Sequence, residues 1–195
     1  MTLLLLQQIL LSMVPIVAAG AANMAFVKAS ILQTLKTPID RGRLCSDGKP
    51  LFGPNKTWKG ALGMIVFCAL AMLAFRGLLG ERFPELTVYR EGSHVYLSPF
   101  LDGALLGLAY ILFELPNSYI KRRLDIDAGT NAAGIRGAAF TLIDQADSVL
   151  GCALLMLLIT DISVAIAALI VAIGSGIHLI VNGLLYLGGL KKQAR

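Results

Sequence analysis

Charged residues are scarce in this sequence. Only 15% of its 195 residues are Asp, Glu, Lys or Arg, whereas a soluble domain usually carries about 25%. Apolar residues reach 56% and gather in blocks of roughly 20, the length that crosses a bilayer as a helix. The composition therefore excludes an ordinary soluble domain and predicts an all-α integral membrane protein.

Cysteine and histidine are equally sparse. The three cysteines are isolated from one another (Cys45, Cys68 and Cys152), which excludes a disulfide framework and a CxxC metal site. Two of them lie in apolar runs, where we expect ordinary buried thiols. The two histidines, His94 and His178, have no partner pattern, and we expect both to be structural.

The apolar blocks predict five transmembrane helices in one membrane-embedded domain, residues 1–195. The first block has no charge before Lys28 and so lacks the basic start of a signal peptide, and we expect it to be retained. The fourth block is short unless it extends back through Asp144, which would put Asp144 and Asp147 in its first turns. The predicted spans are 3–27, 60–79, 99–119, 145–160 and 163–187.

The basic residues predict the orientation. Of 17 lysines and arginines, all but Arg76, Arg82 and Arg90 fall in loops 28–59 and 120–144 or in the C-terminal tail. Cytoplasmic loops carry such an excess, so we expect an outside N-terminus, a cytoplasmic C-terminus and a polar site facing the cytoplasm, in the cell membrane. Because the cations are dispersed and no nucleic-acid module is present, we expect an anionic substrate and no nucleic acid.

Small residues recur along the last predicted span, and such residues allow helices to approach closely. Such a face fits internal packing and a homodimer equally well. The residues concerned are Gly174, Ser175, Gly176 and Gly183 in the span and Gly188 and Gly189 directly after it.

A polar stripe marks the end of the third span. Glu114, Ser118, Lys121 and Arg122 are spaced i, i+4, i+7 and i+8, so they share one helix face. Pro116 removes a helix hydrogen bond, and we expect a kink that opens a cavity there. A carboxylate followed by two cations suits a metal-bound phosphate chain; the alternative is an interfacial anchor of basic residues.

Asp144 and Asp147 are three residues apart and also share a helix face. Two such carboxylates repel each other unless a cation lies between them, and Mg²⁺ is commonly held by one or two carboxylates together with substrate phosphates. The alternative is a pair of acids that stabilises a helix N-terminus.

The polar loop 36–59 contains the third group of candidates. Gly53-Pro54 predicts a turn, after which Asn55, Lys56 and Thr57 precede the second span. Backbone N–H groups at a helix start, together with Lys and Thr, can bind phosphate, although no Walker motif is present. The alternative is a connecting loop with Trp58 as an interfacial anchor.

These motifs resemble the signature of the CDP-diglyceride synthetases, D-x3-S-x-x-K-R followed by a glycine-rich stretch and D-R-x-D. The shorter spacing, Pro38-Ile-Asp40, and the segment from Asp47 to Trp58 resemble the CDP-archaeol synthase branch more closely. The sequence departs from the family patterns at three positions, where Glu114 replaces Asp, Gln145 replaces Arg and Ser148 replaces an aromatic residue. In addition, Gly134-Ile-Arg136-Gly137 occupies the region of a Pro-Gly-His-Gly-Gly loop.

The resemblance implies a cytidylyltransferase that joins CTP and a membrane lipid phosphate, of archaeol ether type or phosphatidate, to give a CDP-lipid and pyrophosphate. It implies Mg²⁺, or alternatively Mn²⁺, on Asp144, Asp147 and Glu114. The catalytic residues would be Asp144, Asp147, Lys121 and Arg122. Substrate binding would fall to Asp40, Asp47, Asn55, Lys56, Thr57, Ser118 and Arg136.

Two other functions are weighed against this one. A CDP-alcohol phosphotransferase would need a D-G-x2-A-R signature, but Lys49-Pro50 follows Asp47-Gly48. A transporter subunit or non-catalytic scaffold would be expected to show repeats and charges at mid-membrane, whereas the charges here gather at one predicted interface.

Overall fold

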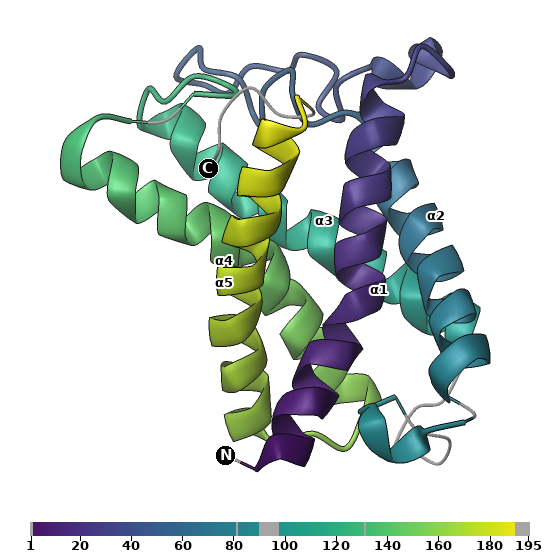
Figure 1. Ribbon diagram of the computed structural model, residues 1–195. Helices are drawn as coiled ribbons and strands as arrows, with labels where there is room; N and C mark the ends of the chain where they lie inside the picture. Colours follow the sequence, from purple (N-terminus) through teal and green to yellow (C-terminus); the bar gives the residue numbers. More distant parts are fainter. Residues whose placement is uncertain (1, 81, 90–97, 131, 190–195) are drawn as a thin grey trace.

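A computed structural model describes residues 2–80, 82–89, 98–130 and 132–189. Arg90, His94 and the tail cations Lys191, Lys192 and Arg195 lie outside the described residues. Within the described ranges, five helices are long and apolar enough to cross a membrane, as the composition predicts. They are α1 (Leu3–Lys28), α2 (Trp58–Phe75), α3 (Pro99–Arg123), α4 (Gly134–Ile159) and α5 (Val164–Leu187) (Figure 1). Short helices η1 (Gln33–Lys36), η2 (Arg76–Gly80) and η3 (Pro84–Leu86) lie between them.

The fourth helix differs from its predicted bounds. It begins at Gly134 rather than at residue 145, so Asp144 and Asp147 lie in its interior. A helix dipole acts mainly on the first and last turns, and these acids therefore do not serve as N-terminal charges. The third helix likewise continues through Pro116 to Arg123, which keeps Lys121 and Arg122 on the same helix as Glu114.

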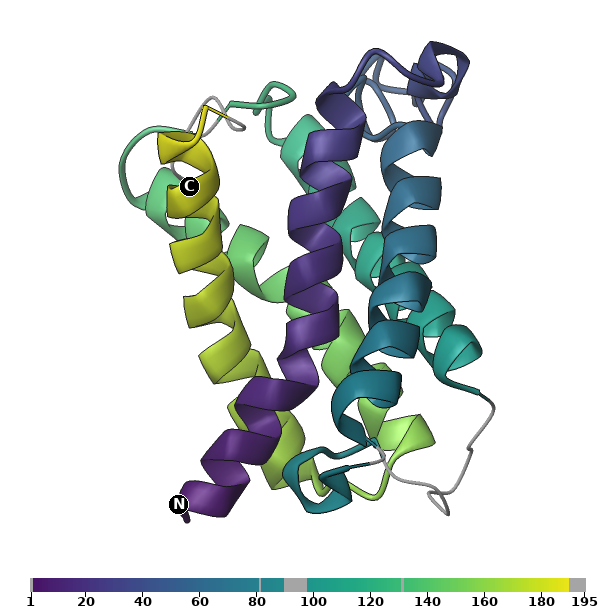
Figure 2. The same cartoon turned by 45° about the vertical axis from the view of Figure 1, so that its right-hand side comes forward.

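The five helices close into a ring in chain order. Each packs on the next, and α1 also contacts α5, as both views of the ribbon show (Figures 1 and 2). The apolar core occupies the half of the bundle nearer the N-terminal end of α1, with Ile9, Leu106 and Met156 fully buried. Cys68 and Cys152 are buried there, which confirms the expectation for both thiols. The other half of the bundle contains polar side chains.

Close helix approach occurs between α2 and α3 and depends on two glycines one turn apart. A Cβ at Gly103 would lie 2.4 Å from the Cys68 carbonyl oxygen, and one at Gly107 would lie 2.7 Å from the Ile65 Cα. On α5, by contrast, Gly176 and Gly183 have nothing within 4 Å of such a Cβ. Gly174 of the same helix does pack internally, since a Cβ there would lie 2.4 Å from Met13 Cε and 2.6 Å from Val149 Cγ1. Internal packing thus accounts for one glycine of α5, and a homodimer through the others stays a prediction.

Gly107→Ala should destabilise the bundle by about 1–3 kcal/mol, because the methyl group meets backbone atoms that cannot move aside. Gly176→Ala is the matched control, since it also places alanine inside a helix but in open space. It should be neutral or stabilising by up to about 1 kcal/mol. Unfolding of the purified proteins in detergent measures both, and equal stability of the two variants would contradict the close packing.

Candidate active site

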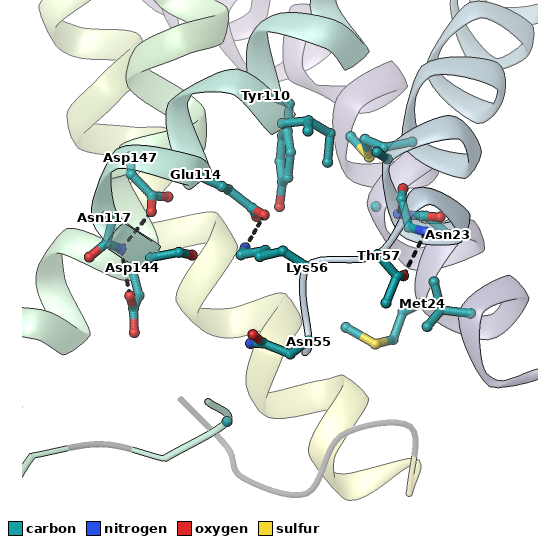
Figure 3. Close-up of a pocket in the computed structure, with 18 of the residues that line it drawn as sticks. Asn23, Met24, Asn55, Lys56, Thr57, Tyr110, Glu114, Asn117, Asp144 and Asp147 are labelled. Atoms are coloured by element: carbon teal, nitrogen blue, oxygen red, sulfur yellow. Dashed lines mark hydrogen bonds and ion pairs between the residues drawn. The ribbon is translucent and has the colours of Figure 1, made fainter. Parts of the chain in front are cut away.

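A cavity of about 570 Å³ opens in the polar half of the bundle. It is lined by the C-terminal part of α1, the start of α2, the second half of α3, the middle of α4 and the C-terminal part of α5, together with the loop that precedes α2 (Figure 3). Four cations, Lys28, Lys56, Lys121 and Arg122, line it together with three acids, Glu114, Asp144 and Asp147. These three acids are the predicted metal ligands.

The loop before α2 is folded around Asp40. Its buried carboxylate accepts hydrogen bonds from the backbone N–H groups of Gly42 (2.9 Å), Phe52 (2.9 Å) and Gly53 (3.1 Å). Burial alone would raise the pKa of Asp40, but these three bonds favour the charged form, and the pKa lies below its ordinary value. An ionised Asp40 thus holds the two ends of the loop together and fixes the segment that contains Lys56.

Two of the acids are paired with cations from other parts of the chain. Lys56 Nζ lies 2.5 Å from Glu114 Oε2, and Lys121 Nζ lies 2.5 Å from Asp144 Oδ1. The first pair joins the loop before α2 to α3, and the second joins α3 to α4. Each pair is partly exposed to the cavity, so an incoming polyanion could reach both lysines.

Asn117 links the two aspartates. Its Nδ2 donates to Asp144 Oδ1 and to Asp147 Oδ2, each at 2.7 Å, so these two oxygens cannot be further apart than twice that distance. The backbone N–H of Ser148 donates to Asp147 Oδ1 at 2.6 Å. The structure therefore brings Asp144 and Asp147 together, as their spacing predicts.

Arg122 differs from the other cavity cations. It is buried, and it makes no hydrogen bond or ion pair with any residue that the structure describes; its Nε is fully enclosed. The charge of Asp127 acts on this guanidinium without forming an ion pair with it, and burial of a charge so weakly compensated is costly. Its neighbour Arg123 points elsewhere: its NH1 lies 3.1 Å from Asp47 Oδ1, and it stacks 4.9 Å from the Tyr119 ring. Arg122 is thus placed to receive an anion from the cavity.

The predicted substrate-binding residues divide into two sets. Asn55, Lys56, Thr57 and Ser118 line the cavity, and the hydroxyl of Thr57 also caps α2 by accepting from Gly60 N. Asp40, Asp47 and Arg136 do not line it. Asp40 is turned into its own loop, Asp47 pairs with Arg123, and Arg136 is exposed in the first turn of α4. Their placement supports structural or peripheral roles.

Several polar residues of the cavity escaped the sequence interpretation, among them Tyr110, Asn117, His178 and Asn182. His178 was expected to be merely structural, yet its Nε2 lies 3.4 Å from the Tyr110 hydroxyl and its Nδ1 lies 3.2 Å from the Gln145 carbonyl oxygen. Helical spacing could have found them, because Tyr110 and Asn117 extend the face of Glu114 and Lys121, and His178 and Asn182 are four apart.

No group of three or more His, Cys, Asp or Glu side chains in the described ranges is arranged to hold a metal ion. Glu114 points toward Lys56, whereas Asp144 and Asp147 face Asn117 (Figure 3). The predicted metal site on Asp144, Asp147 and Glu114 stays a prediction.

Fold and site define a polytopic helical membrane protein with a charged cavity at one end of its bundle. The model of the CarS-like CDP-archaeol synthases matches residues 4–194, and the chain belongs to this family. It is 34% identical over 162 residues to the CDP-archaeol synthase of Methanoculleus marisnigri, covering 80% of this chain and 88% of that protein. The corresponding enzyme of Methanosarcina mazei is 28% identical over 169 residues, with 80% and 89% covered.

A solved structure has the same fold. It is described as an intramembrane enzyme for archaeal membrane lipid biosynthesis and superposes with a TM-score of 0.63 over 89% of this chain and 91% of the other. The two sequences are 23% identical, so this likeness supports the arrangement of helices and not the assignment of individual residues.

Proposed function

We propose that this protein transfers the cytidylyl group of CTP to a membrane lipid phosphate of the archaeol ether type. An oxygen of the lipid phosphate attacks the α-phosphorus of CTP, a new phosphoanhydride bond forms, and the bond to the β-phosphate breaks to release pyrophosphate. The observation that carries the proposal is the charged cavity between five apolar helices, in a chain of the CDP-archaeol synthase family. Family membership favours this function over a CDP-alcohol phosphotransferase or a transporter subunit.

The nucleophile is already anionic near neutral pH, so the protein needs no strong base. Its task is to hold two polyanions together and to stabilise the leaving pyrophosphate. Lys56, Lys121 and Arg122 line the cavity and would neutralise phosphate oxygens. Asn55, Thr57 and Ser118 lie beside them and would orient the nucleotide through hydrogen bonds.

The carboxylate pair fits a hard divalent cation. Asp144 and Asp147 present oxygen ligands that Asn117 holds together, and Mg²⁺ is typically bound by one or two carboxylates plus substrate phosphates. Glu114, the third predicted ligand, is held by Lys56 and would contribute only if that pair separated. When bound, Mg²⁺ or Mn²⁺ would neutralise triphosphate charge and fix its orientation.

We place the cavity at the cytoplasmic face of the cell membrane. The cavity lies at the same end of the bundle as the loop between α1 and α2 and the loop between α3 and α4. These loops and the helix turns that border them contain 11 of the 17 lysines and arginines, at residues 28–59 and 121–136, and cytoplasmic loops and their borders are enriched in such residues. CTP would enter from the water, while the lipid tails remain among the exposed apolar side chains of the helices.

The test is an assay of the purified protein in lipid nanodiscs with CTP and either an archaeol-type ether phosphate or phosphatidate. We expect pyrophosphate and a CDP-lipid by mass spectrometry, with the ether lipid preferred, and loss of activity in EDTA that Mg²⁺ or Mn²⁺ restores. Full turnover in EDTA would refute the metal requirement. Absence of any CDP-lipid from either lipid would refute the function.

A further inference from the structure

Asn117 occupies the centre of the acid pair. Its side-chain nitrogen lies 2.7 Å from a carboxylate oxygen of Asp144 and 2.7 Å from one of Asp147 (Figure 3). A nitrogen that donates to two carboxylates at once stands where a bound cation would relieve their mutual repulsion. The amide thus bridges the two acids, while Lys121 at 2.5 Å compensates the charge of Asp144.

The side-chain oxygen of Asn117 lacks a hydrogen bond from the described residues. Asn117 is 8% exposed, and its Oδ1 accepts no hydrogen bond from any residue in the described ranges. A buried acceptor without a partner costs about 1–3 kcal/mol, and buried polar groups are rarely left so. Because the oxygen and nitrogen of an amide are similar in size, a half-turn of the side-chain amide would exchange their positions without new space.

After such a turn, Oδ1 would stand close to one oxygen of Asp144 and one of Asp147. Three oxygens so placed repel one another unless a cation lies among them. Mg²⁺ binds oxygen at about 2.1 Å in octahedral geometry, so neighbouring ligand oxygens lie about 3 Å apart. The spacing around Asn117 matches this edge length. Lys121 lies 2.5 Å from Asp144, so a cation bound there would take over part of the charge compensation that Lys121 now provides, while Glu114 is held by Lys56.

We propose that Asn117 is the third protein oxygen ligand of the divalent cation, and that its amide turns between two states. In the metal-free state Nδ2 holds the aspartates together, and in the loaded state Oδ1 faces the cation. This inference rests on the proposed function, because it assumes that Asp144 and Asp147 bind the cation. It adds a ligand from α3 to the two from α4, so that metal binding fixes these helices to each other.

Two substitutions separate a ligand from a mere hydrogen-bond donor. Asn117→Ala removes both ends of the amide, whereas Asn117→Asp keeps an oxygen ligand and removes the N–H donor. For a ligand, Mn²⁺ affinity should fall about tenfold or more in the alanine variant and should be retained or increased in the aspartate variant. For a donor alone, the aspartate variant should bind Mn²⁺ no more tightly than the alanine variant.

Free Mn²⁺ is measured by electron paramagnetic resonance during titration of the protein in nanodiscs, without lipid phosphate. Asn182→Ala is the matched control, because Asn182 also lines the cavity but bonds Gln145 instead of the aspartates. It should bind Mn²⁺ as the wild type does. Equal affinity of wild type and Asn117→Ala would overturn the proposal, as would equal weakness of Asn117→Ala and Asn117→Asp.

A measurement on the wild-type chain keeps the test independent of variant folding. Protein with ¹³Cγ-labelled asparagine and bound Mn²⁺ should show a ¹³C hyperfine coupling by electron–nuclear double resonance, and its absence would overturn the ligand role. Asp147→Asn distinguishes a failure of the Asn117 ligand from a failure of the aspartate site as a whole. If Mn²⁺ binding depends on Asp147 but not on Asn117, only this inference fails; if it depends on neither, the proposed aspartate site fails as well.

Discussion

Asp147→Asn is expected to reduce CDP-lipid formation by at least about a thousandfold. A bound metal ion contributes several kcal/mol of charge stabilisation, and each 1.36 kcal/mol corresponds to a tenfold change in rate. The substitution keeps the size of the side chain but removes its charge. In the wild type, the Asn117 amide and the Ser148 N–H both donate to Asp147. The new NH₂ group would face one of these two donors and could not accept its hydrogen bond. Initial rates with CTP and lipid phosphate at saturating Mg²⁺ give the effect.

Asp125→Asn is the matched control for this substitution. Asp125 pairs with Lys49 at 2.6 Å, and its side chain is 79% exposed outside the cavity. Its φ of 59° is one that asparagine tolerates well, so this variant should keep its fold and nearly all of its activity. Near-normal turnover by Asp147→Asn would remove Asp147 from the catalytic machinery, and the fold of that variant is checked by its thermal unfolding in detergent.

Hydropathy predicts that five helices exist but not where each one ends. Arg136, Gly134 and Gly137 interrupt the stretch before Asp144 and hide it as part of a span, yet Ala138, Ala139 and Leu142 favour helix. The helix α4 therefore begins at Gly134. The close approach of α2 and α3 was equally hidden, because the sequence does not show which glycines meet backbone and which meet open space.

Helical spacing predicts part of the site well. Asp144 and Asp147 share a face because they are three apart, and Ser118 and Lys121 follow Glu114 for the same reason. The pairing of Lys56 with Glu114 could not be predicted, because it depends on the fold of an irregular loop. Asp40 shows the same limit: its residue type suits ligand binding, but its carboxylate is directed to three backbone N–H groups.

Arg122→Gln is expected to lower kcat/KM for CTP by about a hundredfold. Removing one preorganised donor to developing charge typically costs 10²–10³ in rate, and Arg122 lines the cavity with no hydrogen bond or ion pair to the residues described. Arg122→Lys keeps the charge but loses the planar fork that binds phosphate in two places. It should therefore fall between the wild type and Arg122→Gln, with a loss of about tenfold.

The adjacent Arg123 makes the comparison decisive, because its guanidinium lies outside the cavity against Asp47 and the carbonyl of Pro50. Arg123→Gln should change kcat/KM by less than about threefold, because Arg123 does not line the cavity. It should lower the thermal midpoint, because it removes the contacts with Asp47 and with the carbonyl of Pro50. Arg122→Gln should leave that midpoint unchanged or raise it, because it removes a buried charge that is compensated only by Asp127, with which it forms no ion pair. A structural Arg122 would give the opposite pattern: a lower midpoint with kcat/KM retained in the fraction that remains folded. Opposite signs of the stability and activity effects at Arg122 would therefore identify a residue whose partner is an anion that enters the cavity.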